Sequence, residues 1–196
     1  VHSDIPTKGH IHTSSEIINK LWKASCYSYL SNLVGYPTDC PQREKNGWTG
    51  DTNAAMDLGF YNYDPITVYE KWMDDHKDAQ LPNGVYPNII PSPGWGYDWA
   101  NGTDWTSTNI AVPWKTWLFY GDDHLLRSMY GNMKAYMDYI ERTYPEGLTD
   151  WGLGDWIPVK STSSVELTSS IYYYDDARMM ARIAAITGHD EDVLHY

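Results

Sequence analysis

A length of 196 residues is enough for one domain with a hydrophobic core. The formal net charge of −12, with 26 acidic and 14 basic residues and no Lys/Arg cluster, excludes a binder of nucleic acid or of anionic membranes, because both partners attract basic surfaces. The sequence contains 10 Trp and 17 Tyr but only 2 Phe. Trp and Tyr combine an apolar face with a polar group, so this excess indicates partly hydrated surfaces of the kind that bind sugar rings. For any single ring, a position in the core is the common alternative.

The first twelve residues are predicted to be a linker that enters the domain, and residues 13–196 are assigned to the domain itself. A capping box, Thr13 followed by Glu16, opens the first predicted helix, which ends before Gly35. Its apolar positions follow roughly helical spacing and are Ile17, Ile18, Leu21, Trp22, Tyr29 and Leu33. The next segment, 36–51, has no periodicity and reads as a long loop, and such loops are often functional.

Further helices are predicted at 52–61 and 65–80, the second opened by a cap at Asp64 and a proline at the first helical position. Residues 81–104 are crowded with Pro, Gly, Asn and Trp and are predicted to be loop. Three more helices are predicted at 108–120, 123–143 and 169–187, and another begins near residue 191. Because no convincing alternating strand is present, the predicted class is all-α.

Helical pairs joined by long aromatic loops predict an α/α toroid, in which inner and outer helices alternate and the loops at one end line a pocket. The predicted helices make up about half of an (α/α)6 ring, so residues 13–196 are interpreted as its N-terminal half. Half a ring would leave inner-helix faces uncovered. We therefore expect association with the missing C-terminal half of the same domain or with a second copy.

The loop at 37–51, PTDCPQREKNGWTGD, packs three carboxylates, an arginine and a tryptophan into one segment. Carboxylates that lie close together repel, so one of them keeps its proton to a higher pH and can serve as a general acid. Trp48 could shield such a carboxyl from water and offer a wall for a sugar ring. A solvated loop with a chance cluster of charges is the alternative.

This segment resembles the signature of the α-L-rhamnosidases of glycoside hydrolase family 78, whose common form is DCPQRDERLGWTGD. The chain has the form of the loop that is one residue shorter. The resemblance continues at Asn62-Tyr63-Asp64, Val112-Pro113-Trp114 and Gly154-Asp155-Trp156. It covers nearly the whole chain and about half of the family's catalytic domain.

The resemblance implies an (α/α)6 toroid that releases terminal α-L-rhamnose from glycosides or polysaccharides with inversion. By position, Glu44 matches the general acid, and we expect it to be buried and protonated. The rhamnose hydroxyls would be bound by the matches Asp39, Arg43 and Asp51. Aromatic walls of the same pocket would be Trp48, Trp105 and Trp156. A rhamnose-containing carbohydrate is thus the implied partner.

Two departures from the family pattern bear on the site. Ser107 stands where the family often has an acidic residue, so we expect the pocket or its aglycone side to differ. The family's catalytic base is a Glu in the second half of the toroid, which lies outside this sequence. Glu166 is a weak surrogate, because opposing acid and base usually come from separate elements placed across the sugar.

No cofactor is expected. The cysteines Cys26 and Cys40 provide no disulfide framework, and no Cys/His spacing of zinc type occurs. A His-x-His pair, His10 and His12, could chelate a metal, but it lacks further nearby ligands. The sequence leaves the compartment open, with a secreted or periplasmic location favoured for a glycan-degrading enzyme.

Three rival functions are considered. A non-catalytic sugar-binding fragment would keep the aromatic walls and the acids without turnover. Another α/α-toroid enzyme, such as a hydrolase or lyase acting on uronic acids, would need basic residues for the substrate carboxylate, and the loops contain few. A helical interaction scaffold would be favoured by a fixed-period repeat, which is not found.

Overall fold

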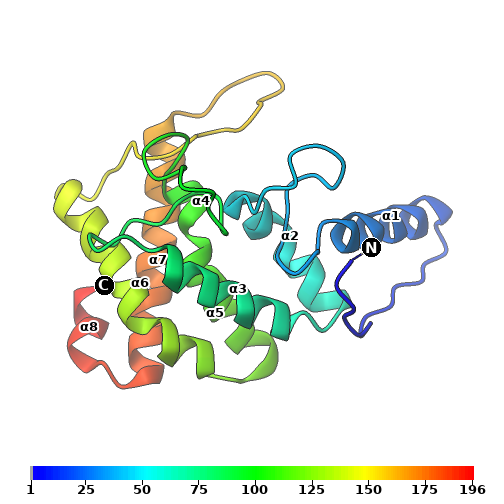
Figure 1. Ribbon diagram of the computed structural model, residues 1–196, viewed down its shortest axis with the longest axis horizontal. Helices are drawn as coiled ribbons and strands as arrows, with labels where there is room; N and C mark the ends of the chain where they lie inside the picture. The colour runs from blue at the N-terminus through cyan, green and yellow to red at the C-terminus, as the bar shows by residue number, and fades with distance from the viewer. Residues whose placement is uncertain (1) are drawn as a thin grey trace.

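The computed structural model describes residues 2–196, and within them the regular structure is helical, with three isolated β-bridges (Figure 1). The predicted all-α class is confirmed. No helix in this part of the chain has both the length and the hydropathy that a bilayer crossing requires. The helices are α1 (Glu16–Ser31), α2 (Thr49–Asn62), α3 (Ile66–Ala79), α4 (Thr103–Thr106), α5 (Thr108–Tyr120), α6 (His124–Thr143), α7 (Val165–Thr187) and α8 (Asp190–His195).

The helices form successive hairpins, and the central helix of the arrangement is α5. Helix α5 contacts α2, α3, α6 and α7, while α4 packs against both α2 and α7. The long loops that precede α2, α4 and α7 lie on the same side of the molecule, the upper side in Figure 1. The N-termini of three neighbouring helices therefore meet at the loop end of the hairpins, where a toroid has its pocket.

The main core lies between α2, α3, α5, α6 and α7 and is rich in rings and methionines. Trp72, Met129 and Tyr136 are fully buried, and burial of such a side chain contributes roughly 1.5–3 kcal/mol. Two of these rings have hydrogen-bonded polar tips: Trp72 Nε1 donates to the Ile90 carbonyl at 2.8 Å, and the Tyr136 and Thr106 hydroxyls lie 3.0 Å apart. The aromatic residues thus fix the helices in orientation as well as burying apolar area.

Several helix starts, and one additional helix, differ from the sequence prediction. Helix α2 begins at Thr49, before the predicted residue 52, and the N-cap of α3 is Pro65, where Asp64 was expected. The N-cap of α1 is Ser15, whose side chain accepts from the Ile18 amide, while Thr13 bonds to Asn19 instead. The short helix α4 was not predicted, because four residues are too few for a periodicity. Helix α7 begins at Val165, before the predicted residue 169, because Ser164 caps it.

The N-terminal segment packs along α1 and the end of α2. Thr7 pairs with Tyr63, the Lys8 amide donates to Asn62, and the Lys8 ammonium lies 3.2 Å from Asp64. Val1 lies outside the described residues. The division into a linker at 1–12 and a domain from 13 onward stays a prediction.

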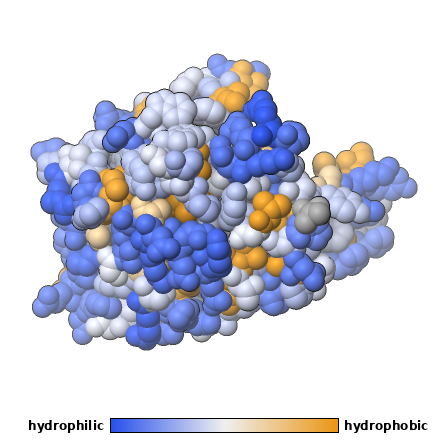
Figure 2. Space-filling model, in the orientation of Figure 1, coloured by the Kyte–Doolittle hydropathy of each residue, from blue (hydrophilic) through white to orange (hydrophobic). Residues whose placement is uncertain are grey.

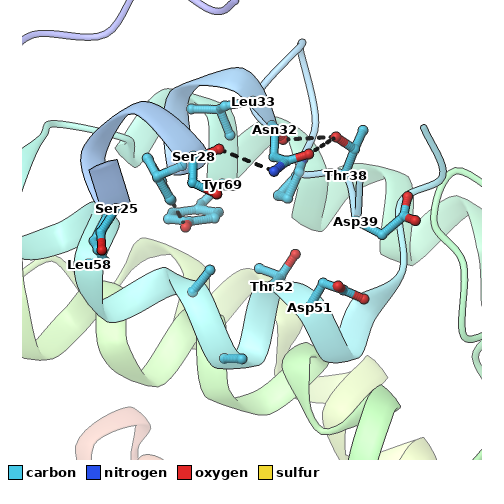
Figure 3. Close-up of a pocket in the computed structure, with 14 residues that line it drawn as sticks. Ser25, Ser28, Asn32, Leu33, Thr38, Asp39, Asp51, Thr52, Leu58 and Tyr69 are labelled. Carbon is cyan, nitrogen blue, oxygen red and sulfur yellow. Dashed lines mark hydrogen bonds between the residues drawn. The ribbon is translucent and has the colours of Figure 1, made fainter. Parts of the chain in front are cut away.

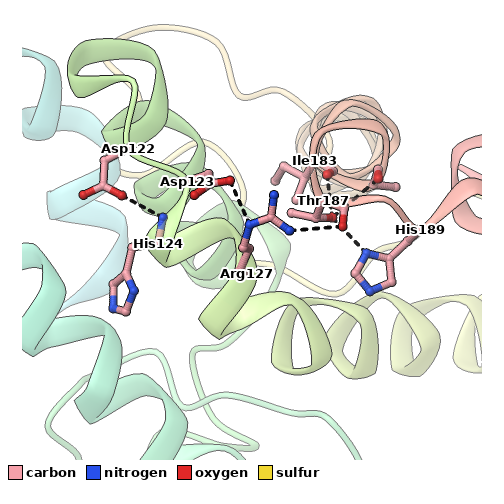
Figure 4. A network of polar contacts seen from close by, with 8 residues as sticks. Asp122, Asp123, His124, Arg127, Ile183, Thr187 and His189 are labelled. Atoms are coloured by element: carbon pink, nitrogen blue, oxygen red, sulfur yellow. Dashed lines mark hydrogen bonds and ion pairs between the residues drawn. The ribbon is translucent and has the colours of Figure 1, made fainter.

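A polar network fixes the start of α6 to the end of α7 (Figure 4). Arg127 joins Asp123 at 2.8 Å and also donates to the carbonyl of Thr187 at 3.3 Å. The Thr187 hydroxyl in turn lies 2.9 Å from Nδ1 of His189. This network lies at the end of the hairpin opposite to the long loops, so it stabilises the scaffold and not the site.

Large apolar side chains remain exposed on α1. Ile17, Ile18 and Leu21 are 71%, 51% and 62% exposed, and Figure 2 shows apolar surface over this helix. Helix α7 also exposes Ile171 and Tyr174. Contiguous exposed apolar residues of this kind are typical of an interface.

Candidate active site

The motif loop is closed by hydrogen bonds between its own residues. The Asp39 carboxylate accepts the Asn46 amide at 3.0 Å and the Cys40 thiol at 2.8 Å. The Cys40 sulfur also accepts the Glu44 amide at 3.2 Å. The loop then leads directly into α2, whose first turn carries Asp51. The acids of the loop, Asp39 and Glu44, therefore lie close to Asp51 of the helix.

All seven predicted site residues line a single cavity of about 630 Å³. The loop before α2 and the α2 N-terminus contribute Asp39, Arg43, Glu44, Trp48 and Asp51, whereas Trp105 comes from α4 and Trp156 from the loop before α7. The roles assigned to these residues stay predictions. Their convergence from three separate segments places acids and aromatic faces around one space of the size of a small-ligand site.

Glu44 lies at the rim of this cavity. One carboxylate oxygen accepts the Trp48 indole N–H at 3.0 Å, and the other lies 3.3 Å from Arg43. The expected burial is not found, because the Glu44 side chain is 38% exposed and the neighbouring Arg43 side chain 79% exposed. The indole nevertheless holds the carboxylate in a fixed position beside the cavity.

Asp51 is the acid of this site whose pKa is raised. The surrounding protein removes water from its carboxylate, and the charges of Asp39 and Glu44 add repulsion, so the pKa of Asp51 rises to about 6. The repulsion predicted for clustered carboxylates therefore acts on Asp51. A carboxyl with a raised pKa in a cavity is typical of functional sites.

One group of potential metal ligands occurs in the part of the chain that the structure describes. Asp39, Cys40 and Glu44 each place one ligand atom within 4.8 Å of the others. The thiol of this group donates to Asp39 and accepts from the Glu44 amide, so hydrogen bonding accounts for the grouping.

The aromatic wall opposite the motif loop depends on a glycine. The rings of Trp105 and Trp156 meet edge to face, with centroids 6.1 Å apart. Gly50, in the first turn of α2, lies against Trp105, and a Cβ added there would approach the indole to 2.5 Å. A glycine at position 50 thus allows Trp105 to reach the cavity.

A buried carboxylate positions the loop that carries Trp156. Asp104 is 4% exposed, and its Oδ2 accepts the Leu153 and Gly154 amides at 2.8 and 2.7 Å. Burial raises the pKa of Asp104, while these two amides oppose the rise. At the same place Gly102 and Gly152 lie in close contact, because a Cβ on Gly102 would approach the Gly152 Cα to 2.1 Å.

Ser107, which replaces a family acid, does not line the cavity. It is buried beneath the site, and its hydroxyl lies 2.5 Å from Asp176 Oδ2 and 2.6 Å from the Thr103 carbonyl oxygen. Glu166 is exposed and lies outside the cavity lining.

Sequence reasoning missed some residues of the site. Trp99 is the most prominent of them, and the others are Cys40, Ala100, Leu153 and Ile157. The tryptophan content of the loop at 81–104 could have indicated Trp99 as a candidate. The loop has no periodicity, however, so the sequence does not show which of its side chains face the cavity.

A second cavity, of about 310 Å³, lies between α1 and α2 (Figure 3). Its lining is mostly small or hydroxylated, for example Ser25, Ser28 and Thr52. Asp39 and Asp51 line both cavities. These two carboxylates therefore separate the site from a space behind it.

Helical hairpins whose loop ends surround a cavity lined by acids and tryptophans are typical of an α/α-toroid glycosidase. The model of the bacterial α-L-rhamnosidase six-hairpin glycosidase domain matches residues 6–196. The chain belongs to this α-L-rhamnosidase family, and both the resemblance and the predicted toroid class are confirmed.

Individual α-L-rhamnosidases are similar to this chain in sequence and in structure. An α-L-rhamnosidase of Formosa agariphila is 30% identical over 94% of the chain and 21% of its own length. The structure of the Dictyoglumus thermophilum α-L-rhamnosidase matches with a TM-score of 0.94 and 32% identity, over the whole chain and 22% of that protein. The Streptomyces avermitilis α-L-rhamnosidase complexed with L-rhamnose matches with a TM-score of 0.90 and 28% identity, over 95% of the chain and 18% of that protein. The chain thus spans about a fifth of the length of these relatives.

Proposed function

We propose that this chain forms the acid-bearing part of the active site of an inverting α-L-rhamnosidase that releases terminal α-L-rhamnose. One observation carries the proposal: acids and indole rings from three separate segments line one cavity. Indole faces suit the C–H face of a sugar, and carboxylates suit its hydroxyls. The rhamnosidase relatives, one of them complexed with L-rhamnose, support this sugar as the ligand.

Glu44 is the proposed general acid, which gives its proton to the departing glycosidic oxygen. A sugar in the cavity would cover the Glu44 carboxyl and exclude water from it. The ion pair between Glu44 and Arg43 is weak, because both partners reach solvent. The Trp48 indole, which bonds to one oxygen, orients the carboxyl toward the leaving group.

Asp39 and Asp51 are proposed to accept hydrogen bonds from the rhamnose hydroxyls. Their negative charge would also stabilise the positive charge that develops on the ring in an oxocarbenium-like transition state. Trp105 and Trp156 would form the wall on the other side of the ring.

Inversion needs a second carboxylate across the ring, about 6.5–9.5 Å from the acid, with a water between them. We propose that it comes from a part of the catalytic domain outside these 196 residues. The same part would cover the exposed apolar face of α1 and is the proposed partner of this half-domain. If the isolated chain binds rhamnose without turnover, this result would be consistent with an acid in this chain and a base in another part of the catalytic domain.

The test is Glu44→Gln in the whole protein, assayed on an aryl α-L-rhamnoside beside other aryl glycosides. Loss of general acid catalysis is expected to lower kcat by about 10²–10⁴-fold, while affinity for L-rhamnose is retained. Glu146→Gln, which changes an exposed acid in the loop before α7, is the matched control. Activity on a different sugar alone, or an unaffected Glu44→Gln variant, would contradict the proposal.

A further inference from the structure

Three tryptophans form a continuous chain of ring contacts that starts beside Glu44 and ends at Trp99, which also lines the cavity. Trp48 meets Trp95 edge to face, with centroids 6.0 Å apart, and Trp95 lies 5.8 Å from Trp99. Trp95 is 40% exposed and Trp99 is 68% exposed. Side chains of this size are seldom left open without a ligand or partner surface.

The loop that carries Trp95 and Trp99 is built to hold these rings in place. The buried Asn88 side chain donates to the carbonyls of Trp99 and Ala100. Asn101, also buried, donates to Tyr97 and Tyr86 carbonyls at 2.8 Å each. These two amide side chains thus fix the backbone of the loop at residues 97–100, which lowers the entropy cost of binding a ligand beside Trp99.

The position of the rings relative to the acid indicates which part of a substrate they would meet. A general acid must face the oxygen of the leaving group. Trp48 bonds directly to Glu44, and Trp95 and Trp99 follow Trp48 in the chain of ring contacts. Since Trp99 also lines the cavity, the rings continue the sugar site on the acid side.

The charge of this loop favours a neutral leaving group over an anionic one. Residues 91–102 contain one acid, Asp98, and no Lys or Arg. An anionic leaving group such as a uronic acid would find no counter-charge from this loop. A neutral ring with an apolar face would find two indole surfaces.

We propose that Trp95 and Trp99 form a subsite for a neutral, ring-containing leaving group, either a sugar residue or an aryl group. This inference rests on the proposed function, because it takes Glu44 as the acid. The indole faces would hold the leaving group beside the acid while its glycosidic oxygen receives the proton.

The test compares three ligands in the whole protein: L-rhamnose, an aryl α-L-rhamnoside and a neutral rhamnosyl-glucose disaccharide. Calorimetry is carried out with Glu44→Gln as the background, so that the ligands stay intact, and kcat/KM is measured with Glu44 present. Trp99→Ala is expected to weaken binding of the ring-bearing ligands, and their kcat/KM, by about five- to tenfold. Affinity for L-rhamnose is expected to fall by a smaller factor, because L-rhamnose carries no leaving-group ring for Trp99 to hold.

Trp99→Phe, which keeps an aromatic face, should restore most of the loss, and Val159→Ala, at another exposed position, should have no effect. A loss confined to the aryl ligand or to the disaccharide would support the subsite and identify the leaving group. Equal loss for L-rhamnose, or no loss for either longer ligand, would overturn the subsite and leave the proposed function standing. A protein that binds none of the three would overturn both.

Discussion

Gly50 shows how one missing side chain determines the shape of the site. In a helix, alanine is usually more stable than glycine by about 0.5–1 kcal/mol. At position 50 this gain should reverse, because a Cβ would meet the Trp105 ring at 2.5 Å and the cost of overpacking is about 1–3 kcal/mol.

We therefore expect Gly50→Ala to lower the free energy of unfolding and to weaken L-rhamnose binding, as measured by urea unfolding and calorimetry. Gly131→Ala in α6 is the control, since nothing lies within 4 Å of its added Cβ and a modest stabilisation is expected there. Equal effects of the two changes would show that Trp105 does not depend on the glycine.

Asp51 gives the stability a definite pH dependence. Its pKa of about 6 in the folded chain lies above the ordinary value, so the folded state binds more protons between about pH 4 and pH 6. The contribution of Asp51 to the free energy of unfolding should therefore fall as the pH rises through this window and stay constant above it.

Asp51→Asn removes the titrating group, so its urea midpoint should rise relative to that of the unaltered chain between pH 4.5 and pH 7. The difference between the two proteins isolates Asp51 from the other acids. Parallel midpoints across this range would mean that Asp51 titrates at an ordinary pH.

At the scale of elements, Asp104 joins α4 to the loop that leads to α7. Replacing it by alanine leaves the Leu153 and Gly154 amides without their acceptor, which we expect to cost about 2 kcal/mol of stability. Hydrogen exchange should accelerate at residues 151–157 in Asp104→Ala and remain unchanged in Glu146→Gln. Slow exchange at Leu153 and Gly154 in the alanine variant would show that other contacts hold the loop.

Local sequence signals predicted most of the helices. Gly188, at positive φ, ends α7 where it was expected, and Gly121 does the same after α5. The start of α7 was missed because Ser164 lies in a run of serine and threonine residues that offers several possible caps. Helix α4 was missed because its four residues are held by tertiary contacts, such as the bond from Thr103 Oγ1 to the Ser169 carbonyl at 2.8 Å.

The candidate site was predictable where it is contiguous in sequence. Residues of the motif loop were found together because they lie within thirteen consecutive positions, 39–51. The sequence did not predict the roles of Trp99 and Asp104, because the orientation of each side chain depends on partners elsewhere in the chain. Trp99 depends on Asn88, and Asp104 acts on amides about fifty residues further along.

For the whole molecule, the exposed face of α1 predicts association. Ile17, Ile18 and Leu21 lie together on a helix that otherwise packs mainly on α2. We expect the 196-residue chain to self-associate or to bind the rest of its catalytic domain, as measured by size-exclusion chromatography with light scattering.

Ile17→Lys combined with Leu21→Lys should reduce this association, whereas Val159→Lys, which introduces the same side chain at a 95% exposed position in the loop before α7, should not. A chain that is a stable monomer in its unaltered form would contradict the prediction.

The contact between Gly102 and Gly152 has a consequence for engineering this site. A side chain on Gly102 would meet the backbone of Gly152, and a side chain on Gly152 would meet Ser169 and Asp104, so neither position has room for a larger residue. A library that varies specificity should therefore keep both positions constant and place its diversity at Trp95 and Trp99, whose exposed rings have room for replacement.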